Sequence, residues 1–329
     1  DSAANVQSTA STLTVTVDTT VPTAATSLAL AATGGTNQVA NALNGGNTNF
    51  TVTATITGDV GSGGGTAELL VGAASFSTPI TASVASGATS VSLTPSFTTT
   101  AAVQAAMTAG SKSLTVKLTD SAGNVATSSA LTVLADYTDP TAATSLALAA
   151  TGGTNQVANA LNGGNTNFTV TATITGDVGS GGGTAELLVG AASFSTPITA
   201  SVASGATSVS LTPSFTTTAA VQAAMTAGSK SLTVKLTDSA GNVATSSALT
   251  VLADYTAPTA ATSLAFTASG GTVVADTLNA TNTNFTVTAT VTGDVGSGGG
   301  TAELLVGGAS FSTPITASVA SGATSVSLT

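Results

Sequence analysis

Four residue types are missing from this chain, and each absence removes a class of chemistry. The 329 residues contain no cysteine, no histidine, no tryptophan and no arginine. Without cysteine there are no disulfides, thiolate nucleophiles or cysteine-based metal sites. Without histidine the chain lacks the commonest general base and transition-metal ligand. The sequence therefore predicts a protein that is not an enzyme, with neither catalytic residues nor an organic cofactor.

Charge is also scarce. Only 5% of the residues are charged, against roughly 25% in an average globular protein, and the net charge is -10. Four lysines are too few to neutralise a phosphate backbone, so we expect no nucleic-acid partner. No run of about 18 apolar residues predicts a membrane span. The excess of Thr, Ser, Ala and Gly is typical of secreted bacterial surface proteins, which predicts an extracellular or cell-surface location.

The chain repeats itself at an offset of 118 residues. Residues 23–137 recur without change as residues 141–255, and the first difference is Asp139, which becomes Ala257. A third copy starts at Pro258, diverges over residues 266–280 and then rejoins the pattern. A repeat of this length is a whole domain, so the sequence predicts a tandem array. The predicted parts are the last strands of a preceding repeat (1–18), two near-identical repeats (19–136 and 137–254) and a truncated repeat (255–329).

Within each repeat the dominant pattern is the alternation of apolar and polar residues. Seven short strands are predicted in the first repeat, around residues 28–30, 49–58, 69–71, 80–84, 91–93, 114–118 and 131–133. One short helix, residues 99–109, is predicted between the fifth and sixth strands, with Gly110 as its C-terminal stop. The predicted fold class is all-β: immunoglobulin-like sandwiches arranged end to end as a rod.

The third repeat stops before its sixth and seventh strands. Its apolar inner face would then be bare, so we expect a continuing chain or a strand from another copy to complete it. Residues 1–17 align with the seventh strand of a repeat, which favours continuation over exchange between copies.

Two motifs recur at fixed places relative to the strands. Residues 120–124 (Asp-Ser-Ala-Gly-Asn) and 136–140 (Asp-Tyr-Thr-Asp-Pro) have counterparts at 238–242 and 254–258, and also at 1–5 and 17–23. These motifs resemble the bacterial Ig-like repeats that form the extender regions of giant surface adhesins. The resemblance implies a structural role, and it implies calcium at the junctions between repeats.

Acidic residues cluster where consecutive repeats should meet. If repeats are chained end to end, the linker of one approaches two loops of the next, and carboxylates there could supply the six to eight oxygens, at about 2.3–2.6 Å, that Ca²⁺ prefers. The predicted ligands are Asp136, Asp139, Asp177, Asp238 and Asn242 at one junction, Asp18, Asp59, Asp120 and Asn124 at the equivalent junction before it, and Asp254 and Asp294 at a weaker third. The alternative is that Asp and Asn only form turns, by bonding the local backbone.

Other patterns have more than one interpretation. Glu68 and Lys117 should face outward on neighbouring strands, which favours an ion pair over an isopeptide bond. The glycine-rich segment 61–66 lacks the lysine of a phosphate loop and precedes a strand, so a plain loop is favoured. Glycosylation sequons begin at Asn49, Asn167, Asn279 and Asn284. Rows of Thr-x-Thr suggest ice binding, but a twisted sheet would not keep such rows flat.

These patterns predict a structural function. We expect an extender, stalk or fibre-forming region of a large secreted bacterial surface protein, whose partners are further repeats of the same chain or other copies in a filament. The alternative is a module that binds glycans or another ligand. Binding modules usually present aromatic platforms, and the two tyrosines here, Tyr137 and Tyr255, both lie in linkers.

Overall fold

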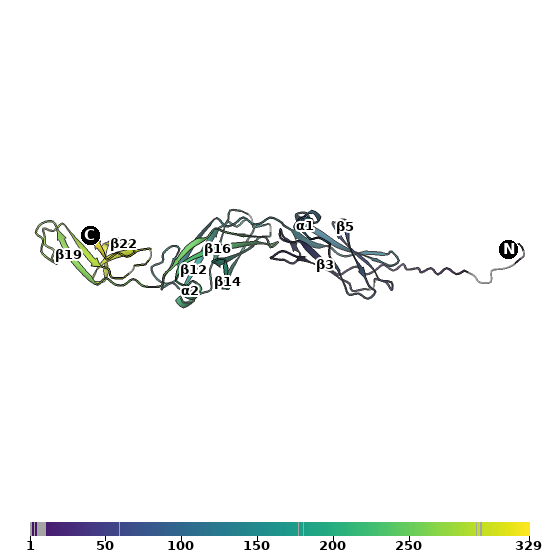
Figure 1. Ribbon diagram of the computed structural model, residues 1–329, viewed down its shortest axis with the longest axis horizontal. Helices are drawn as coiled ribbons and strands as arrows, with labels where there is room; N and C mark the ends of the chain where they lie inside the picture. The colour runs from purple at the N-terminus through teal and green to yellow at the C-terminus, as the bar shows by residue number, and fades with distance from the viewer. Residues whose placement is uncertain are drawn as a thin grey trace.

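The computed structural model describes residues 2, 4, 11–58, 60–176, 178–179, 181–293, 295–296 and 298–329. Three strand-rich parts follow one another along the longest axis of the molecule, and an extended N-terminal segment leads into the first (Figure 1). The described part is almost entirely strands and loops, with one short helix in each of the first two repeats. The predicted all-β class is confirmed. None of the described helices is long and apolar enough to cross a membrane.

The first repeat is a sandwich of two sheets. One sheet has the order β1-β3-β6, and the other has the order β2-β9-β7-β4-β5 with β8 paired to β7. All seven predicted strands are present, and β2 and β8 are short additions. The elements are β1 (Ser27–Thr33), β2 (Ala42–Leu43), β3 (Asn49–Thr55), β4 (Gly65–Val71), β5 (Ala74–Val84), β6 (Ser90–Leu93), α1 (Thr100–Ala106), β7 (Gly110–Asp120), β8 (Val125–Thr127) and β9 (Leu131–Ala135).

The second repeat has the same elements in the same order. Its sheets are β10-β12-β15 and β11-β18-β16-β13-β14, with β17 paired to β16. The elements are β10 (Ser145–Thr151), β11 (Ala160–Leu161), β12 (Asn167–Thr173), β13 (Gly183–Val189), β14 (Ala192–Val202), β15 (Ser208–Leu211), α2 (Thr218–Ala224), β16 (Gly228–Asp238), β17 (Val243–Thr245) and β18 (Leu249–Ala253).

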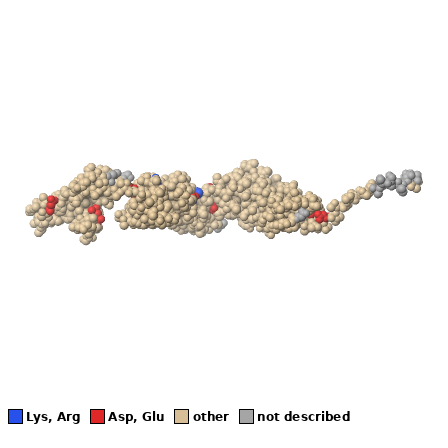
Figure 2. Space-filling view, turned by 90° about the horizontal axis from the view of Figure 1, so that it is seen from below, with Lys and Arg blue, Asp and Glu red and all other residues tan. Residues whose placement is uncertain are grey.

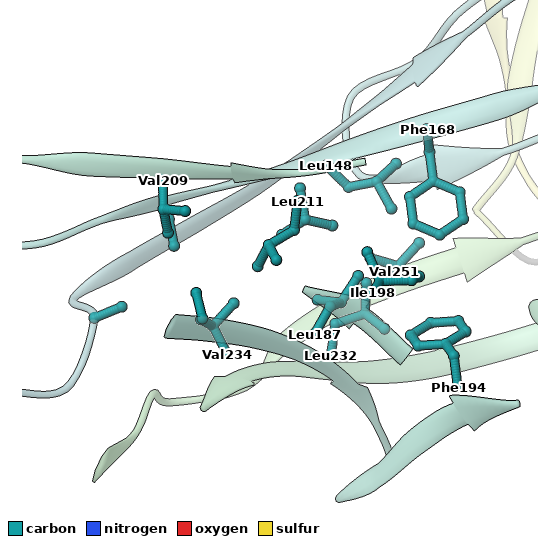
Figure 3. Close-up of a cluster of buried hydrophobic side chains, with 14 of the residues drawn as sticks. Leu148, Phe168, Leu187, Phe194, Ile198, Val209, Leu211, Leu232, Val234 and Val251 are labelled. Atoms are coloured by element: carbon teal, nitrogen blue, oxygen red, sulfur yellow. The ribbon is translucent and has the colours of Figure 1, made fainter. Parts of the chain in front are cut away.

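Each complete repeat buries its own core between its two sheets. Strand β3 shows why: Phe50, Val52 and Ala54 are fully buried, while the threonines between them face outward. In the second repeat Phe168, Leu187, Leu211 and Val234 point toward one another from opposite sheets (Figure 3). In strands such as β3, alternation thus places the apolar residues on the inner face of the sandwich.

The helix lies where it was predicted, between β6 and β7, but it is shorter. Thr99 caps its N-terminus by accepting a hydrogen bond from the Ala102 N–H, and Met107 is the C-terminal cap. The prediction that Gly110 stops the helix was wrong. Gly110 has a φ of 111° and is the first residue of β7, so its glycine conformation serves the entry to a strand.

The described residues of the third repeat form five strands. They are β19 (Ser263–Ser269), β20 (Asn284–Thr290), β21 (Gly300–Val306), β22 (Ala309–Val319) and β23 (Ser325–Leu328). They form the sheet β19-β20-β23 and the pair β21-β22. Its cluster of buried apolar residues has four members, Ala289, Val291, Val319 and Val326. Without the sixth and seventh strands, this part of the chain buries little of its apolar surface.

Candidate functional site: the junction between the first two repeats

The loop at residues 238–242, which joins β16 to β17, is held in shape by its own acid. One carboxylate oxygen of Asp238 accepts hydrogen bonds from the Ala240 N–H and the Asn242 N–H, each at 2.9 Å. The other oxygen accepts one from the Asn242 side-chain amide, at 2.8 Å. We call residues 238–242 the junction loop. Residues 120–124 form the same loop in the first repeat, with the same bonds from Ala122 and Asn124.

The Asn242 amide connects the two repeats. Its Nδ2 donates to the backbone carbonyl of Asp136, at 2.9 Å, and its Oδ1 accepts from the Gly45 N–H, at 2.7 Å. Both partners belong to the first repeat or its linker. Asp136 is itself fixed, because its N–H donates to the Leu43 carbonyl. One side chain therefore links the second repeat to two fixed points on the first.

Gly241 packs directly onto the first repeat. A Cβ atom added at this position would lie 2.1 Å from the Asn37 carbonyl oxygen and 2.9 Å from the Asn44 side-chain nitrogen. Asn44 is buried, and its Nδ2 donates to that same Asn37 carbonyl at 3.0 Å. The contact is close enough that only glycine fits.

The two copies of the loop provide an internal comparison, because their sequences are identical. Ala240, Gly241 and Asn242 are buried at the junction, whereas Ala122 and Gly123 are exposed. A Cβ added at Gly123 would meet nothing within 4 Å. The difference in burial therefore comes from contact between the repeats and not from the fold of a single repeat.

Tyr137 holds the linker against the first repeat. Its hydroxyl donates to the carbonyl of Met107, the C-terminal cap of α1, at 2.5 Å, and its ring packs against the core of the first repeat. Burial raises the pKa of Tyr137 to about 12. Tyr255 bonds Met225 in the same way, and burial raises its pKa as well. The tyrosines are parts of the preceding core, which argues against a role as exposed binding platforms.

Three of the acids near the junctions form turns. Asp18, Asp136 and Asp254 each accept a hydrogen bond from the N–H two residues later. Hydrogen bonds from Asn124, first from its side chain and then from its N–H, lower the pKa of the Asp120 carboxyl. Turn formation, the alternative to metal binding, is therefore observed at these positions.

The predicted calcium ligands come together only in part. Asp136 and Asp238 both lie beside Gly179: a Cβ there would be 3.7 Å from Asp136 Oδ2 and 3.6 Å from Asp238 Cβ. Asp139 lines a groove of about 350 Å³ together with Gly45, Tyr137 and Asn242. Asp59, Asp177 and Asp294 lie outside the described residues. Among the residues that are described, no three acidic side chains gather around one point. Calcium at these junctions stays a prediction.

The second junction exposes the surface that the first junction covers. Asn162 holds the Asn155 carbonyl just as Asn44 holds Asn37, at 2.9 Å. Here Asn162 is only half-buried, and Gly163 and Gly164 are exposed. A groove of about 480 Å³ lies beside them, lined also by Tyr255 and Ala257. No junction loop from the described part of the third repeat covers this surface.

Glu68 and Lys117 face each other across β4 and β7, as predicted. They are paired in register and form an ion pair, and the equivalent pair Glu186–Lys235 has a separation of 2.6 Å. Ser75 adds a hydrogen bond to Glu68 at 2.5 Å. The lysine first, and then the serine, lower the pKa of Glu68. Both side chains are partly exposed and form an ion pair, which favours this interpretation over an isopeptide bond.

The surface around Asn37, Asn44 and Gly45, which receives the junction loop, was not predicted from the sequence. Its residue types are typical of turns, and nothing in a single repeat shows that they face the next one. Asn44-Gly45-Gly46 recurs as Asn162-Gly163-Gly164, but so does every residue from 23 to 137, so the repetition does not single this surface out.

Comparisons with known proteins give no family. No known sequence family matches the chain, and no curated protein sequence matches it. One similar solved structure is described as a Ca²⁺-stabilized adhesin that helps an Antarctic bacterium reach out and bind ice. Its sequence is 20% identical to this chain, and the TM-score is 0.32. The match covers 93% of this chain and 66% of that one. Another concerns host cell surface retention of a 1.5-MDa bacterial ice-binding adhesin, with 19% identity, a TM-score of 0.28 and coverage of 87% and 81%.

A third similar structure is a Bacteroides ovatus protein, SGBP-B of a mixed-linkage glucan utilization locus, in complex with a mixed-linkage heptasaccharide. It is 15% identical, with a TM-score of 0.19 and coverage of 83% of this chain and 63% of that one. At TM-scores this low, none of the three similarities supports a conclusion about function.

Proposed function

We propose that this chain is an extender of a large secreted bacterial surface protein, which holds a functional part of that protein at a distance from the cell. The observation that carries the proposal is the junction loop. Ala122 and Gly123 are exposed in the first repeat, whereas their counterparts Ala240 and Gly241 are buried in the second, where Asn242 is bonded to the preceding repeat. A contact between repeats that is built from hydrogen bonds and a close glycine contact resists bending.

An array of repeats placed end to end provides a long spacer. Strands of 11 residues such as β5 and β7, at about 3.3 Å per residue, make each repeat roughly 35–45 Å long. Figure 1 shows the repeats following one another without folding back. Each further copy therefore adds its full length to the array.

The surface of the repeats also suits a spacer. Figure 2 shows charged side chains at only a few points along the face in view, and most of that face is uncharged. In the described sandwiches the two tyrosines are bonded within the protein and offer no platform for a sugar ring. No observation favours the alternative, a glycan-binding module.

The proposal is tested by measuring shape in solution. Small-angle X-ray scattering should give a long, narrow particle, and Gly241→Ala should shorten it and broaden its distribution, because the added methyl group cannot fit against Asn37. Gly123→Ala is the matched control. Both glycines have a φ of 96°, so both variants carry the same backbone strain, but only Gly241 touches a neighbouring repeat. A compact particle, or equal effects of the two variants, would contradict the extender.

A further inference from the structure

Asn44 and Gly45 form a dipeptide that can modify itself. When glycine follows asparagine, the glycine nitrogen can close a ring with the asparagine side chain, because glycine has no Cβ atom to hinder the approach. The chain contains two such pairs, Asn44-Gly45 and Asn162-Gly163. In the first pair both residues are held by the contact between the first two repeats, which connects this reactivity with the junction.

The junction explains why position 45 is a glycine. A Cβ atom added there would lie 3.2 Å from the Tyr137 carbonyl oxygen and 3.4 Å from Asn242 Oδ1. A side chain at this position would therefore press against the linker and the junction loop. The close approach of the second repeat thus favours the same residue type that makes the peptide reactive.

The Asn44 side chain is fixed and buried. Its Nδ2 donates hydrogen bonds to the carbonyls of Thr36 and Asn37, at 3.3 and 3.0 Å. Its Oδ1 accepts one from the Gly46 N–H, at 2.9 Å. These bonds restrict rotation of the side chain, and burial keeps water and base away from it.

The nitrogen that would attack is held as well. The Gly45 N–H donates to Asn242 Oδ1, at 2.7 Å. To attack, this nitrogen must lose its proton, and the hydrogen bond to Asn242 would then be lost and its lone pair would face the amide oxygen. The junction loop therefore opposes ring closure in two ways, by covering Asn44 and by binding the proton that must leave.

We propose that Asn44-Gly45 is a site of spontaneous modification that the closed junction protects and that reacts when the junction opens. In the open state base removes the Gly45 amide proton, and the nitrogen attacks Cγ of Asn44. The new bond to Cγ replaces the bond from Cγ to Nδ2, and ammonia leaves after taking a proton from water. Water then opens the five-membered imide and leaves aspartate or isoaspartate at position 44. The net change replaces ammonia by water, and nothing is oxidised or reduced.

The product cannot rebuild the same junction. A carboxylate at position 44 has no N–H for the Thr36 and Asn37 carbonyls, and its charge lies beside their oxygens. The Asn37 carbonyl is also the group against which Gly241 packs. Isoaspartate in addition lengthens the main chain before Gly45. An opening of the junction can thus become permanent. This inference depends on the contact between repeats and not on the extender role.

Peptide mapping by mass spectrometry, at mildly alkaline pH, measures the conversion of Asn44. Conversion should be about tenfold slower in the folded chain than in the chain unfolded by guanidinium, because only the open junction reacts. Asn242→Ala removes the acceptor of the Gly45 N–H and should raise the folded-state rate about two- to tenfold, as expected for one lost hydrogen bond. Asn124→Ala is the matched control in the first repeat and should leave the rate unchanged.

Two other asparagines calibrate the measurement. Residues 156–170 repeat residues 38–52, so Asn162 and Asn44 should react at the same rate once the chain is unfolded. In the third repeat Asn279 has the same place but is followed by Ala280, whose methyl group should make it slower. Circular dichroism on each variant verifies that the sandwiches remain folded, so that a faster rate reports the junction.

The substitution Asn44→Asp imitates one of the two products. By small-angle X-ray scattering it should broaden the length distribution of the particle as Gly241→Ala does. Asn279→Asp, the same change in the third repeat, is the control and should leave the distribution unchanged.

Three results would overturn the proposal. They are equal Asn44 rates in Asn242→Ala and Asn124→Ala, a folded chain that reacts as fast as the unfolded one, and an Asn44→Asp particle as narrowly distributed as the unaltered chain. Protected Asn44 in an unaltered chain that scatters as a compact particle would contradict the extender and support this inference.

Discussion

Two side chains, Asn242 and Tyr137, make hydrogen bonds that hold the linker and the second repeat against the first. Asn242 uses both ends of its amide across the junction, and Tyr137 fastens the start of the linker to the last turn of the preceding helix. Neither residue belongs to a strand. At the scale of single residues, rigidity thus depends on a few polar groups placed at the ends of well-packed sandwiches.

Removing the tyrosine hydroxyls should loosen both linkers and destabilise the repeats. In the double variant Tyr137→Phe, Tyr255→Phe, the carbonyls of the buried residues Met107 and Met225 lose these donors, at a cost of about 0.5–1.5 kcal/mol each in the free energy of unfolding. Urea unfolding of the variant and of the unaltered chain measures this difference. An unchanged unfolding curve would show that the hydroxyl bonds contribute nothing net.

The same hydroxyls predict a loss of stability in alkali. The pKa of Tyr137 is raised from an ordinary value of 10.0 to about 12, so folding favours the protonated form. Its contribution is complete below pH 10 and is lost as the pH rises through about 12. Unfolding free energies measured across this range should fall more for the unaltered chain than for the double phenylalanine variant. Parallel curves would contradict the assignment.

At the scale of elements, β4 and β7 form the central pair of the larger sheet. Their register places Glu68 opposite Lys117, and Ser75 of β5 bonds the same carboxylate. The side chains are partly exposed, so solvent screens much of their attraction. The sandwich is therefore held mainly by its buried aliphatic and phenylalanine side chains, and the ion pair adds a small increment.

A double-mutant cycle on Glu68 and Lys117, made together with Glu186 and Lys235, should give a coupling energy of about 0.2–1 kcal/mol per pair. Because the pKa of Glu68 is lowered, the contribution is present above pH 4.5 and is lost as the pH falls through the lowered value. Glu303→Gln is the control, since the described residues give Glu303 no lysine partner. If that variant loses as much stability as Glu68→Gln, the pairs are not the cause.

The short helix depends on its first cap. Thr99 and Thr217 accept hydrogen bonds from the N–H groups of Ala102 and Ala220, at 3.3 and 3.2 Å. Replacing both threonines by alanine should lower the unfolding free energy by about 1 kcal/mol per repeat, and serine at both positions should restore most of it. Thermal or urea unfolding of the three chains is the measurement. Equal stability of the alanine and serine variants would mean that the cap is not needed.

At the scale of the whole molecule, the first junction combines a turn-forming acid, Asp136, with contact between repeats. Asp139 lies at the first junction, whereas Ala257 replaces it at the second. The resemblance to bacterial Ig-like repeats implies calcium at such places. The carboxylates of Asp136 and Asp238 already accept hydrogen bonds from backbone N–H groups, so a cation would have to use their remaining lone pairs together with residues such as Asp139 and Asp177.

Calorimetric titration with Ca²⁺ tests this directly. We expect the chain to bind calcium, Asp139→Ala to bind it more weakly, and chelation to increase bending at the junctions while each sandwich stays folded. Glu303→Gln removes one negative charge away from the junction acids and should leave the affinity unchanged. Absence of heat in every chain would leave the acids as formers of turns and nothing more.

The sequence alone determined the strands, because alternation of apolar and polar residues has a direct physical meaning in a two-layer sandwich. It also determined the position of the helix and the pairing of Glu68 with Lys117. The end of the helix was misjudged, since Gly110 is as suitable for entry into a strand as for a helix stop. These successes are local: each depends on residues close in sequence or on one strand pair.

Only the tertiary structure decided what the polar residues at the ends of the repeats do. Asn242 and Gly45 are 197 positions apart, and nothing in their local sequence distinguishes a turn from a contact surface. Gly241 and Gly123 occupy the same place in identical loops, and only the three-dimensional structure shows that Gly241 lies against Asn37 of the preceding repeat. Contact between repeats depends on how whole domains are placed in space, which the pattern within one repeat does not reveal.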